Sequence, residues 1–370
     1  MSGMRIVILG LSLSSSWGNG HATTWRALIR GLAARGHHVT FLERDQPWYA
    51  DHRDLAEPDY CQLILYDSLD ALAPFAEAIR DADAVIVGSY VPDGIAVGKM
   101  VQDNARGVVA FYDIDTPVTL AQLDKGECDY LSPERIPGYD YYFSFSGGPV
   151  PSIIEQTYGA PVAAPLYCSV DADRYAPTGA RLRWDLGYLG TYSADRQPAL
   201  ERLLLEPARA APELRFVVAG PQYPDIDWPD NVERIDHVPP AAHADFYSSC
   251  RFSLNLTRQD MVRTGYSPSV RLFEAAACGS PIISDPWAGL EGLFMPEAEI
   301  LIAENSGDIL RALLDIPETR RLAIAAAGRS RVLAEHSSER RAAELETWLS
   351  GGKWPSSASD STKAEQRKIL

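Results

Sequence analysis

The sequence predicts an α/β protein made of two doubly wound domains, each built on a mostly parallel sheet. Short apolar runs alternate with stretches of helical spacing along most of the chain, a pattern typical of parallel sheets covered by helices on both faces. The same pattern begins again at Trp184. The length of 370 residues suits two domains of roughly 100–200 residues each.

In the first half of the chain, the expected strands are nearly continuous apolar runs. They cover residues 5–11, 38–44, 61–67, 83–89, 107–113 and 141–146. Between the first two strands, residues 22–36 place Trp25, Leu28 and Leu32 at helical spacing, and Gly36 ends that helix. A second helix is expected over residues 69–81. These elements predict an N-terminal domain over residues 1–167.

In the second half, strands and helices alternate in the same way. The expected strands cover residues 184–190, 215–220, 232–235, 251–256, 280–284 and 299–302. The expected helical stretches cover residues 198–211, 241–249, 269–278, 306–314 and 319–349. We expect a C-terminal domain over residues 168–335 and a helix over 336–349 that packs back on the N-terminal domain. Residues 350–370 are rich in Ser, Gly and charge, and this composition predicts a disordered tail.

Composition and charge limit the classes of partner. The chain has 34 basic and 50 acidic residues and a net charge of −16, so we expect its surface to repel nucleic acid and anionic lipid. The five cysteines are widely spaced, without a CxxC pair, which predicts reduced thiols in a cytoplasmic protein. No run approaches the roughly 20 apolar residues of a membrane span, and no signal peptide is expected. Composition does not determine the oligomeric state.

The segment from Ser267 to Asp285, SPSVRLFEAAACGSPIISD, carries the strongest functional signal. Ser269 is expected to cap a helix, and the amides of a helix start attract anions. Arg271 lies in the first turn, where its guanidinium suits a diphosphate. Glu274 can accept paired hydrogen bonds from a ribose diol. The alternative interpretation is an ordinary capped helix that carries a solvated acid.

This segment resembles the donor-binding motif of GT-B glycosyltransferases of the large retaining family 4 type. The run from Glu274 through Cys278, Gly279 and Pro281 matches the order and spacing of that motif. The blocks 169–177, 217–226 and 231–257 resemble other parts of the same donor domain. The resemblance implies two Rossmann-like domains that face each other across a cleft. It also implies transfer of a sugar from a UDP-, GDP- or dTDP-sugar, with no cofactor and no metal required.

Four further segments resemble a narrower, bacterial-type group, the glycosyltransferases of the spore maturation protein CgeB type. They are residues 14–37, 111–119, 144–149 and 257–279. With this group included, the resemblance extends over about residues 4–340. The acceptor stays open and includes small metabolites, glycans, lipid-linked sugars and proteins.

The resemblance assigns a role to each matching position of the C-terminal domain. Glu274 is implied to hold the ribose, and Arg196 the phosphates. The remaining donor-binding positions are Gly190, Thr191, Tyr192, Gly220, His237, Val238, Ser269, Val270 and Arg271. Two positions depart from the family pattern. Ser267 stands where the family commonly has an acid, and Thr191 stands where it often has arginine, so the donor sugar is the least defined part of the assignment.

Two loops of the N-terminal domain carry further candidates. Gly18 and Gly20 flank the turn in WGNGH, where glycine permits close approach to a ligand, and His21 begins the following helix. Asp115 in DIDTP follows a buried strand and is placed to orient an acceptor hydroxyl or to act as a base. A structural turn with a capping histidine and an Asx turn are the respective alternatives.

The resemblance implies retention of configuration by front-face displacement, in which the leaving phosphate helps to deprotonate the acceptor. Catalysis then depends on positioning and charge stabilisation by Arg196 and Arg271. If the enzyme inverts, His21 and Asp115 are the candidate bases. Two other functions stay open: a nucleotide-sugar epimerase of the same fold, and a nucleotide-sugar-binding protein that has lost catalysis.

Overall fold

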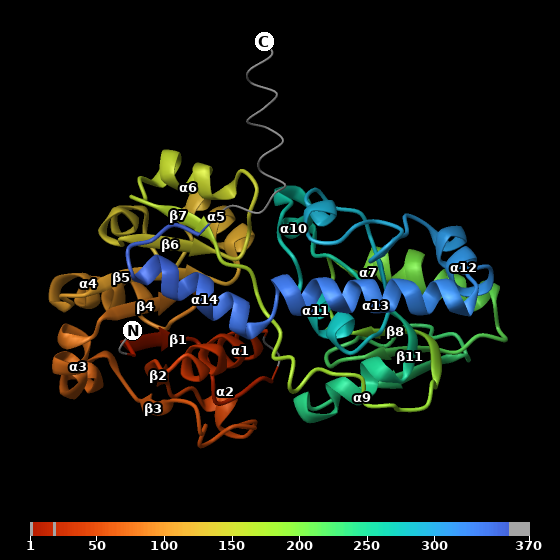
Figure 1. The fold of residues 1–370 in the computed structure, drawn as a ribbon, viewed down its shortest axis with the longest axis horizontal. Helices are drawn as coiled ribbons and strands as arrows, with labels where there is room; N and C mark the ends of the chain where they lie inside the picture. Colours follow the sequence, from red (N-terminus) through yellow and green to blue (C-terminus); the bar gives the residue numbers. More distant parts are fainter. Residues whose placement is uncertain (1–2, 18–19, 355–370) are drawn as a thin grey trace, which may run out of the picture. The chain divides into compact units, whose positions relative to one another are not determined.

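The computed structural model describes residues 3–17 and 20–354. It divides into two compact units, each with its own parallel sheet (Figure 1). Unit 1 contains residues 1–168 and the C-terminal segment from Ser338, and unit 2 contains Ser169–Ser337. From the sequence, we expected the N-terminal domain to end at residue 167 and the C-terminal domain to end at residue 335. Gly18 and most of the tail expected over 350–370 lie outside the described residues.

Unit 1 has a seven-stranded sheet in the order β3-β2-β1-β4-β5-β6-β7, and every strand pair is parallel. The strands are β1 (Arg5–Gly10), β2 (His38–Arg44), β3 (Gln62–Tyr66), β4 (Ala84–Gly88), β5 (Val108–Asp113), β6 (Tyr141–Ser144) and β7 (Ala163–Pro165). The helices are α1 (His21–Ala34), α2 (Pro47–Ala50), α3 (Ala76–Asp81), α4 (Gly94–Asn104), α5 (Thr116–Lys125), α6 (Val150–Tyr158) and α14 (Ser338–Leu349). The short strand β7 had no counterpart among the expected strands.

Two apolar layers cover the two faces of this sheet. Alternate residues of β1 point into different layers: Val7 packs with Val85 of β4 on one face, and Ile8 packs with Trp25 of α1 on the other. Both faces of the strand are therefore buried, which explains why it is a continuous apolar run rather than an alternating one. The helix expected over residues 69–81 begins as a 3₁₀-helix over Leu69–Phe75, because Pro74 cannot donate the hydrogen bond of an α-helical turn.

Helix α14 packs beside α1 within unit 1 (Figure 1). Gly31 makes this approach possible, since a Cβ atom there would lie 2.4 Å from the carbonyl oxygen of Ser338. The helical stretch expected over residues 319–349 is therefore interrupted. Helix α13 (Glu318–Glu335) belongs to unit 2 and α14 to unit 1, with His336 and Ser337 between them.

Unit 2 has a six-stranded parallel sheet in the order β10-β9-β8-β11-β12-β13. Its strands are β8 (Trp184–Leu189), β9 (Phe216–Ala219), β10 (Val232–Ile235), β11 (Cys250–Asn255), β12 (Ile282–Ser284) and β13 (Leu301–Ile302). Its helices are α7 (Gln197–Leu200), α8 (Glu206–Ala210), α9 (His243–Ser248), α10 (Gln259–Thr264), α11 (Val270–Ala277), α12 (Ser306–Leu314) and α13. A π-helical turn, Glu201–Leu205, joins α7 to α8.

Chain order reverses between β1 and β4 in unit 1 and between β8 and β11 in unit 2. Open α/β sheets bind their ligands outside the carboxyl ends of the strands at such switch points. The loops that follow these four strands are therefore the places to look for a site.

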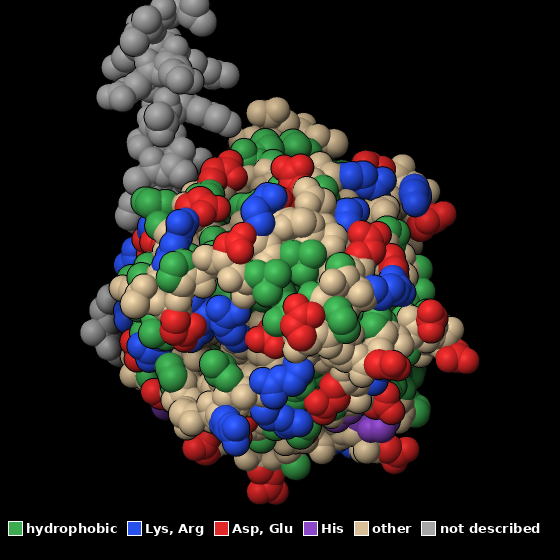
Figure 2. Space-filling view, turned by 90° about the vertical axis from the view of Figure 1, so that its right-hand side faces the viewer, with side chains coloured by type: hydrophobic (Ala, Val, Ile, Leu, Met, Phe, Trp, Pro, Cys, Tyr) green, Lys and Arg blue, Asp and Glu red, His purple; other side chains and the backbone are tan. Residues whose placement is uncertain are grey.

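On the molecular face drawn in Figure 2, acidic and basic side chains are interspersed. None of the helices in the described part of the chain combines the length and the apolar character that a membrane span requires.

Candidate nucleotide-sugar site

In unit 2, the loops after β8 and β9 touch each other at two glycines. The amide of Gly190 donates to Ala219 O at 2.8 Å. Gly220 has a φ of 143°, and a Cβ atom there would lie 2.1 Å from Gly190 O. Gly220 therefore has to be glycine both for its backbone conformation and for this contact. Two of the expected donor-loop positions thus form one backbone junction at the carboxyl edge of the sheet.

Helix α11 starts beside this junction. Ser269 occupies the N-cap position, but its hydroxyl makes no capping hydrogen bond to the helix. This corrects the expected side-chain cap, because the hydroxyl instead accepts from Arg271 Nη1 at 3.4 Å. The first-turn amides of Val270 and Arg271 still belong to a helix N-terminus, where the backbone attracts negative charge.

Arg271 is buried and connects three elements. Its Nε donates to Leu189 O at the end of β8, and its Nη1 donates to Asn255 Oδ1 at 3.1 Å at the end of β11. The guanidinium carbon also lies 4.8 Å from the ring centroid of Tyr188. The sequence analysis predicted that Arg271 binds phosphate. In the structure, its Nε and Nη1 already donate hydrogen bonds within the fold, and these bonds hold the edge of the sheet together.

A network of polar side chains continues from Asn255 to the next strand. Asn255 Nδ2 donates to Ser284 Oγ at 3.0 Å, and Asp285 accepts from Thr257 Oγ1 at 2.8 Å and from Thr257 N at 3.0 Å. Burial raises the pKa of Asp285 above its ordinary value, and the hydrogen bonds from Thr257 offset part of this rise. Sequence reasoning did not single out Asn255 or Thr257. Their position just where an apolar strand ends is the signal that would have identified them.

Glu274 lies on the buried side of α11 with 4% of its surface exposed. Its Oε2 accepts from the hydroxyl of Tyr247 at 3.0 Å. The pKa of Tyr175 is raised well above its ordinary value by burial, by the charge of Glu274 and by a hydrogen bond to that carboxylate. Glu274 is therefore neither a solvated acid nor an isolated one. No sequence pattern pointed to the two tyrosines, because they come from segments distant from α11 in the sequence.

The other expected donor-binding residues lie on the loops around this edge. Arg196 donates from Nη2 to Thr191 O at 2.7 Å, whereas its buried Nε finds no hydrogen-bond partner in the part of the chain that the structure describes. The amide of Tyr192 donates to Pro221 O at 3.0 Å. After β10, His237 is exposed and Val238 is buried. Ser267, at the position of the usual acid, is buried and donates to Gly265 O at 2.7 Å.

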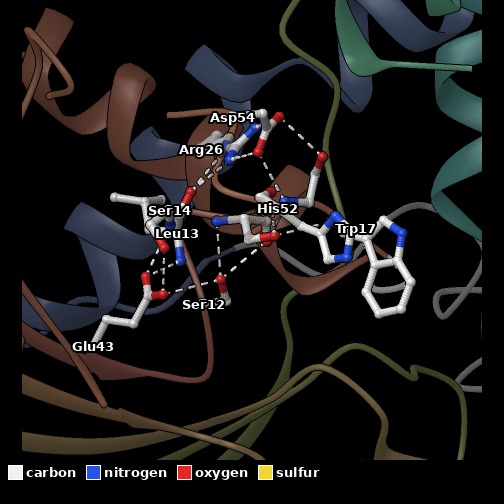
Figure 3. A network of polar contacts seen from close by, with 10 residues as sticks. Ser12, Leu13, Ser14, Trp17, Arg26, Glu43, His52 and Asp54 are labelled. Carbon is white, nitrogen blue, oxygen red and sulfur yellow. Dashed lines mark hydrogen bonds and ion pairs between the residues drawn. The ribbon is translucent and has the colours of Figure 1, made fainter. Parts of the chain in front are cut away.

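In unit 1, the loop after β1 is held by a buried carboxylate (Figure 3). Glu43 of β2 accepts from the amides of Leu13 and Ser14 at 2.6 and 2.8 Å. It also accepts from the hydroxyls of Ser14 and Ser12 at 2.6 and 3.2 Å. Four donors thus converge on one carboxylate, and charge-assisted hydrogen bonds of this kind are the strong ones. The first residues of this loop, Ser12 to Ser14, are thus held by the fold itself.

A second set of hydrogen bonds, centred on Arg26, holds the same loop (Figure 3). Arg26 of α1 donates from Nε and Nη2 to Leu13 O at 2.9 and 2.7 Å and pairs with both carboxylate oxygens of Asp54 at 2.8 Å. Asp54 in turn accepts from the amide and hydroxyl of Ser16, both at 3.0 Å. Trp17 stacks on His52 with ring centroids 4.4 Å apart.

Gly20 precedes α1 with a φ of −84°, and a Cβ atom there would meet none of the described atoms within 4 Å. This backbone conformation is open to any residue, and the expected close approach of a ligand to Gly20 stays a prediction. His21 is the first residue of α1, and its buried Nδ1 has no hydrogen-bond partner among the described residues. Burial lowers the pKa of His21 to about 4, so its imidazole is neutral at pH 7.

Asp115 lies at the N-terminus of α5 and accepts from the hydroxyl of Tyr90 at 3.0 Å. The ring of Tyr90 also meets that of His21 edge to face, with centroids 5.4 Å apart. The structure thus brings the two candidate bases of unit 1 to one tyrosine. Tyr90 has a φ of 62°, an uncommon conformation for a residue other than glycine. Nothing in the sequence pointed to Tyr90 except its place after an apolar strand.

A second, fully buried acid lies next to this group. Asp113 accepts from the hydroxyls of Tyr142 and Thr119 at 2.6 and 2.8 Å and from the amide of Asp115 at 3.2 Å. Burial raises the pKa of Asp113 to about 6, although these hydrogen bonds act in the opposite direction. Among the described residues, no group of three or more His, Cys, Asp or Glu side chains is arranged to hold a metal ion.

Comparison with known families agrees with this geometry. A family profile described as "Glycosyl transferase-like" matches residues 196–347, a range that contains the β9, β11 and α11 edge of unit 2. A comparison with curated proteins finds no match.

The solved structures show the fold. Sucrose-phosphate synthase from Thermosynechococcus elongatus superposes with a TM-score of 0.71 at 16% identity, over 94% of this chain and 98% of the other. HepE from Anabaena, solved with UDP and glucose, gives 0.67 at 12% identity, over 94% and 100%. An alpha-glucosyltransferase solved with UDP-glucose and DNA gives 0.69 at 14% identity, over 94% and 100%. The chain therefore has the GT-B fold of glycosyltransferases and carries a glycosyltransferase-like domain.

Proposed function

We propose that this chain is a glycosyltransferase that moves a sugar from a nucleoside-diphosphate sugar to an acceptor hydroxyl. The observation that carries the proposal is the position of Arg271 and the start of α11 at the switch point of unit 2, with Glu274 one turn further along the same helix. The matched family profile covers the same region. Structures with the same fold hold UDP or UDP-glucose, which makes a UDP-sugar the first donor to test.

In this proposal, Glu274 binds the ribose, and Gly190, Thr191 and Tyr192 approach the diphosphate. The orphaned Nε of Arg196 gives that residue a hydrogen-bond donor to offer a phosphate. Arg271 supports the diphosphate through its charge and through the loop that it holds, since its Nε and Nη1 have partners in the fold. Ser269 and Val270 present the helix start, and Gly220, His237 and Val238 line the base.

We propose further that the reaction retains anomeric configuration and needs no metal. Two arginines and the helix dipole supply positive charge where the diphosphate leaves, and no protein nucleophile is then required. In unit 1, Asp115 and His21 orient the acceptor, and Gly20 directly precedes His21. If the product were inverted, Asp115 would be the better base, because a histidine with a pKa of about 4 binds a proton weakly.

A CgeB-type relationship and a cytoplasmic location stay part of the proposal. The acceptor class is undecided, and the net charge of −16 makes an anionic polymer a poor acceptor because like charges repel.

Donor binding and turnover test the proposal directly. Purified chain is titrated with UDP, GDP and dTDP and with their glucose conjugates, and donor consumption is followed across an acceptor panel with and without EDTA. We expect one nucleotide to bind, an acceptor to accelerate loss of its sugar conjugate, and NMR to show a product with the donor's anomeric configuration. Conversion of the donor to an epimer without acceptor would identify an epimerase instead. Binding without any turnover would identify a protein that has lost catalysis.

Substitution of the ribose-binding residue adds a test at one position. Glu274→Ala is expected to weaken nucleotide binding by about 1–3 kcal/mol, the usual contribution of hydrogen bonds to a charged group. Glu304→Ala, at an exposed acid of the same unit, is the matched control. Unchanged nucleotide affinity in folded Glu274→Ala protein contradicts the assignment.

A further inference from the structure

We propose that Tyr247 and Tyr175 are positioning residues that orient the Glu274 carboxylate toward a ribose diol, so that the protein discriminates ribonucleotides from 2′-deoxyribonucleotides. The inference rests on the proposed function, in which Glu274 contacts the ribose. It goes further because it assigns a selectivity to two side chains that do not themselves touch the ligand.

Tyr247 provides the measured contact. It lies on α9 (His243–Ser248), is 1% exposed, and donates from its hydroxyl to Glu274 Oε2 at 3.0 Å. The aromatic ring is packed against Phe246 and His243, with centroids 5.7 and 6.4 Å away. A donor held this firmly restricts the rotation of the carboxylate to which it donates.

Tyr175, from a different part of unit 2, supports this arrangement through His243. It belongs to the segment just before β8 and is 7% exposed. Burial and the neighbouring carboxylate raise the pKa of Tyr175 and of Tyr247 well above the ordinary value. Both hydroxyls are therefore protonated at neutral pH, and that of Tyr247 remains a donor to Glu274.

The hydrogen-bonding capacity of the carboxylate leaves room for a ligand. A carboxylate has about four lone-pair sites, and the Tyr247 hydroxyl occupies one. Two of the remaining sites match the paired donors of a 2′,3′-diol. Among the described residues, no Lys or Arg forms an ion pair with Glu274, so no cation competes with a ligand for those sites. The cost of burying the charge is offset instead by a neutral donor.

His243 connects this arrangement to the loop expected to line the base. Its Nδ1 lies 3.3 Å from the hydroxyl oxygen of Tyr175, and its Nε2 lies 3.1 Å from Val238 O. Val238 is one of the positions assigned to the base, and Glu274 is the position assigned to the ribose. Polar contacts thus join Tyr175 through His243 to the loop assigned to the base, and the His243 ring packs against that of Tyr247 with centroids 6.4 Å apart.

The test compares UDP with 2′-deoxy-UDP, or GDP with 2′-deoxy-GDP if GDP binds more tightly, by isothermal titration calorimetry on the full chain. We expect the wild-type protein to prefer the ribonucleotide. Tyr247→Phe and Tyr175→Phe should each reduce this preference about fivefold or more, the effect of one lost hydrogen bond, while affinity for the 2′-deoxy nucleotide changes little. Tyr139→Phe removes a hydroxyl from a buried tyrosine of unit 1 and should leave the preference unchanged.

Glu274→Gln separates failure of the inference from failure of the proposed function. If Glu274→Gln abolishes the preference and both tyrosine variants retain it, the positioning role is wrong and the ribose contact stands. If Glu274→Gln also retains the preference, the ribose contact itself is wrong. Equal losses of affinity for both nucleotides in the tyrosine variants would show a purely structural role and overturn the inference. Absence of binding by both UDP and GDP overturns the proposed function and the inference together.

Discussion

Arg271 donates from Nη1 to the side-chain oxygen of Asn255 at 3.1 Å, and this contact joins the start of α11 to the end of β11. The same guanidinium donates through Nε to the last residue of β8. The two strands that flank the switch point of unit 2 are thus held together by one side chain from the helix that follows them. Geometry at the candidate site therefore depends on a residue that also stabilises the fold.

Arg271→Ala should lower both stability and nucleotide affinity. The substitution leaves Leu189 O and Asn255 Oδ1 buried without their donor, which costs about 3 kcal/mol in unfolding free energy. Urea denaturation and calorimetric titration with UDP measure the two effects. Arg263→Ala is the control, since the Arg263 side chain is 75% exposed and pairs only with Asp260 of the same helix, and exposed pairs contribute little. Full stability of Arg271→Ala would contradict the structural role.

Asp113→Asn should stabilise the protein at neutral pH. The pKa of Asp113 rises from an ordinary 3.8 to about 6 in the fold, so the folded state binds a proton that the unfolded state has lost. The contribution of this group to stability is therefore complete below pH 3.8 and is lost as the pH rises toward 6, by about 3 kcal/mol in all. We expect the gain of Asp113→Asn over wild type in urea denaturation to grow between pH 4 and pH 6.5. A gain independent of pH would show that Asp113 is ionised throughout.

His21 should show the opposite pH dependence. Its pKa falls from 6.5 to about 4, so the unfolded state binds the proton first and stability is lost as the pH drops from 6.5 toward 4. In wild type this trend opposes that of Asp113, and we expect the two to cancel largely between pH 4 and 6. NMR titration of the His21 ring should detect no protonation above pH 5, whereas the same ring in urea should titrate near 6.5. Protonation of the folded ring above pH 6 would contradict its burial.

Glu43→Gln should loosen the loop after β1 without changing the sheet. The amide side chain keeps one acceptor oxygen, whereas the carboxylate accepted from four donors. We therefore expect the free energy of unfolding to fall by about 2–3 kcal/mol. Hydrogen exchange at the amides of Leu13 and Ser14 should accelerate, while exchange within β1 stays slow. Glu57→Gln, at an exposed acid, should alter neither. Unchanged protection of the two amides would show that the hydrogen bonds of Arg26 are enough to hold the loop without the Glu43 carboxylate.

Much of the fold follows from the sequence because the sheets are parallel. A strand buried on both faces is a continuous apolar run, and β1, β4 and β9 lie within the ranges that such runs predicted. The GT-B fold expected from the resemblance is confirmed by the solved structures. The strand β7 was missed because it has only three residues, Ala163–Pro165. The split between α13 and α14 depends on which unit each helix packs against, and helical spacing alone carries no such information.

The candidate site was predictable only in part. Glu274 and Arg271 were found through their spacing on one helix, and their roles in the proposed function still await the tests above. The side chains that surround them were not found. Tyr175 and Tyr247 are far from α11 in the sequence, and a tyrosine near an apolar segment is ordinarily read as part of the core.

The sequence by itself determined the class of fold, the order of the strands along the chain and the helix that carries Glu274, because these depend on local apolar periodicity and on a contiguous motif. Only the tertiary structure decided that Arg271 is committed to Leu189 and Asn255, that Glu274 is buried and accepts from Tyr247, and that His21 is neutral. Hydrogen-bond partners and burial are properties of the packed chain. They arise from residues that folding brings together across long separations, and no local pattern records them.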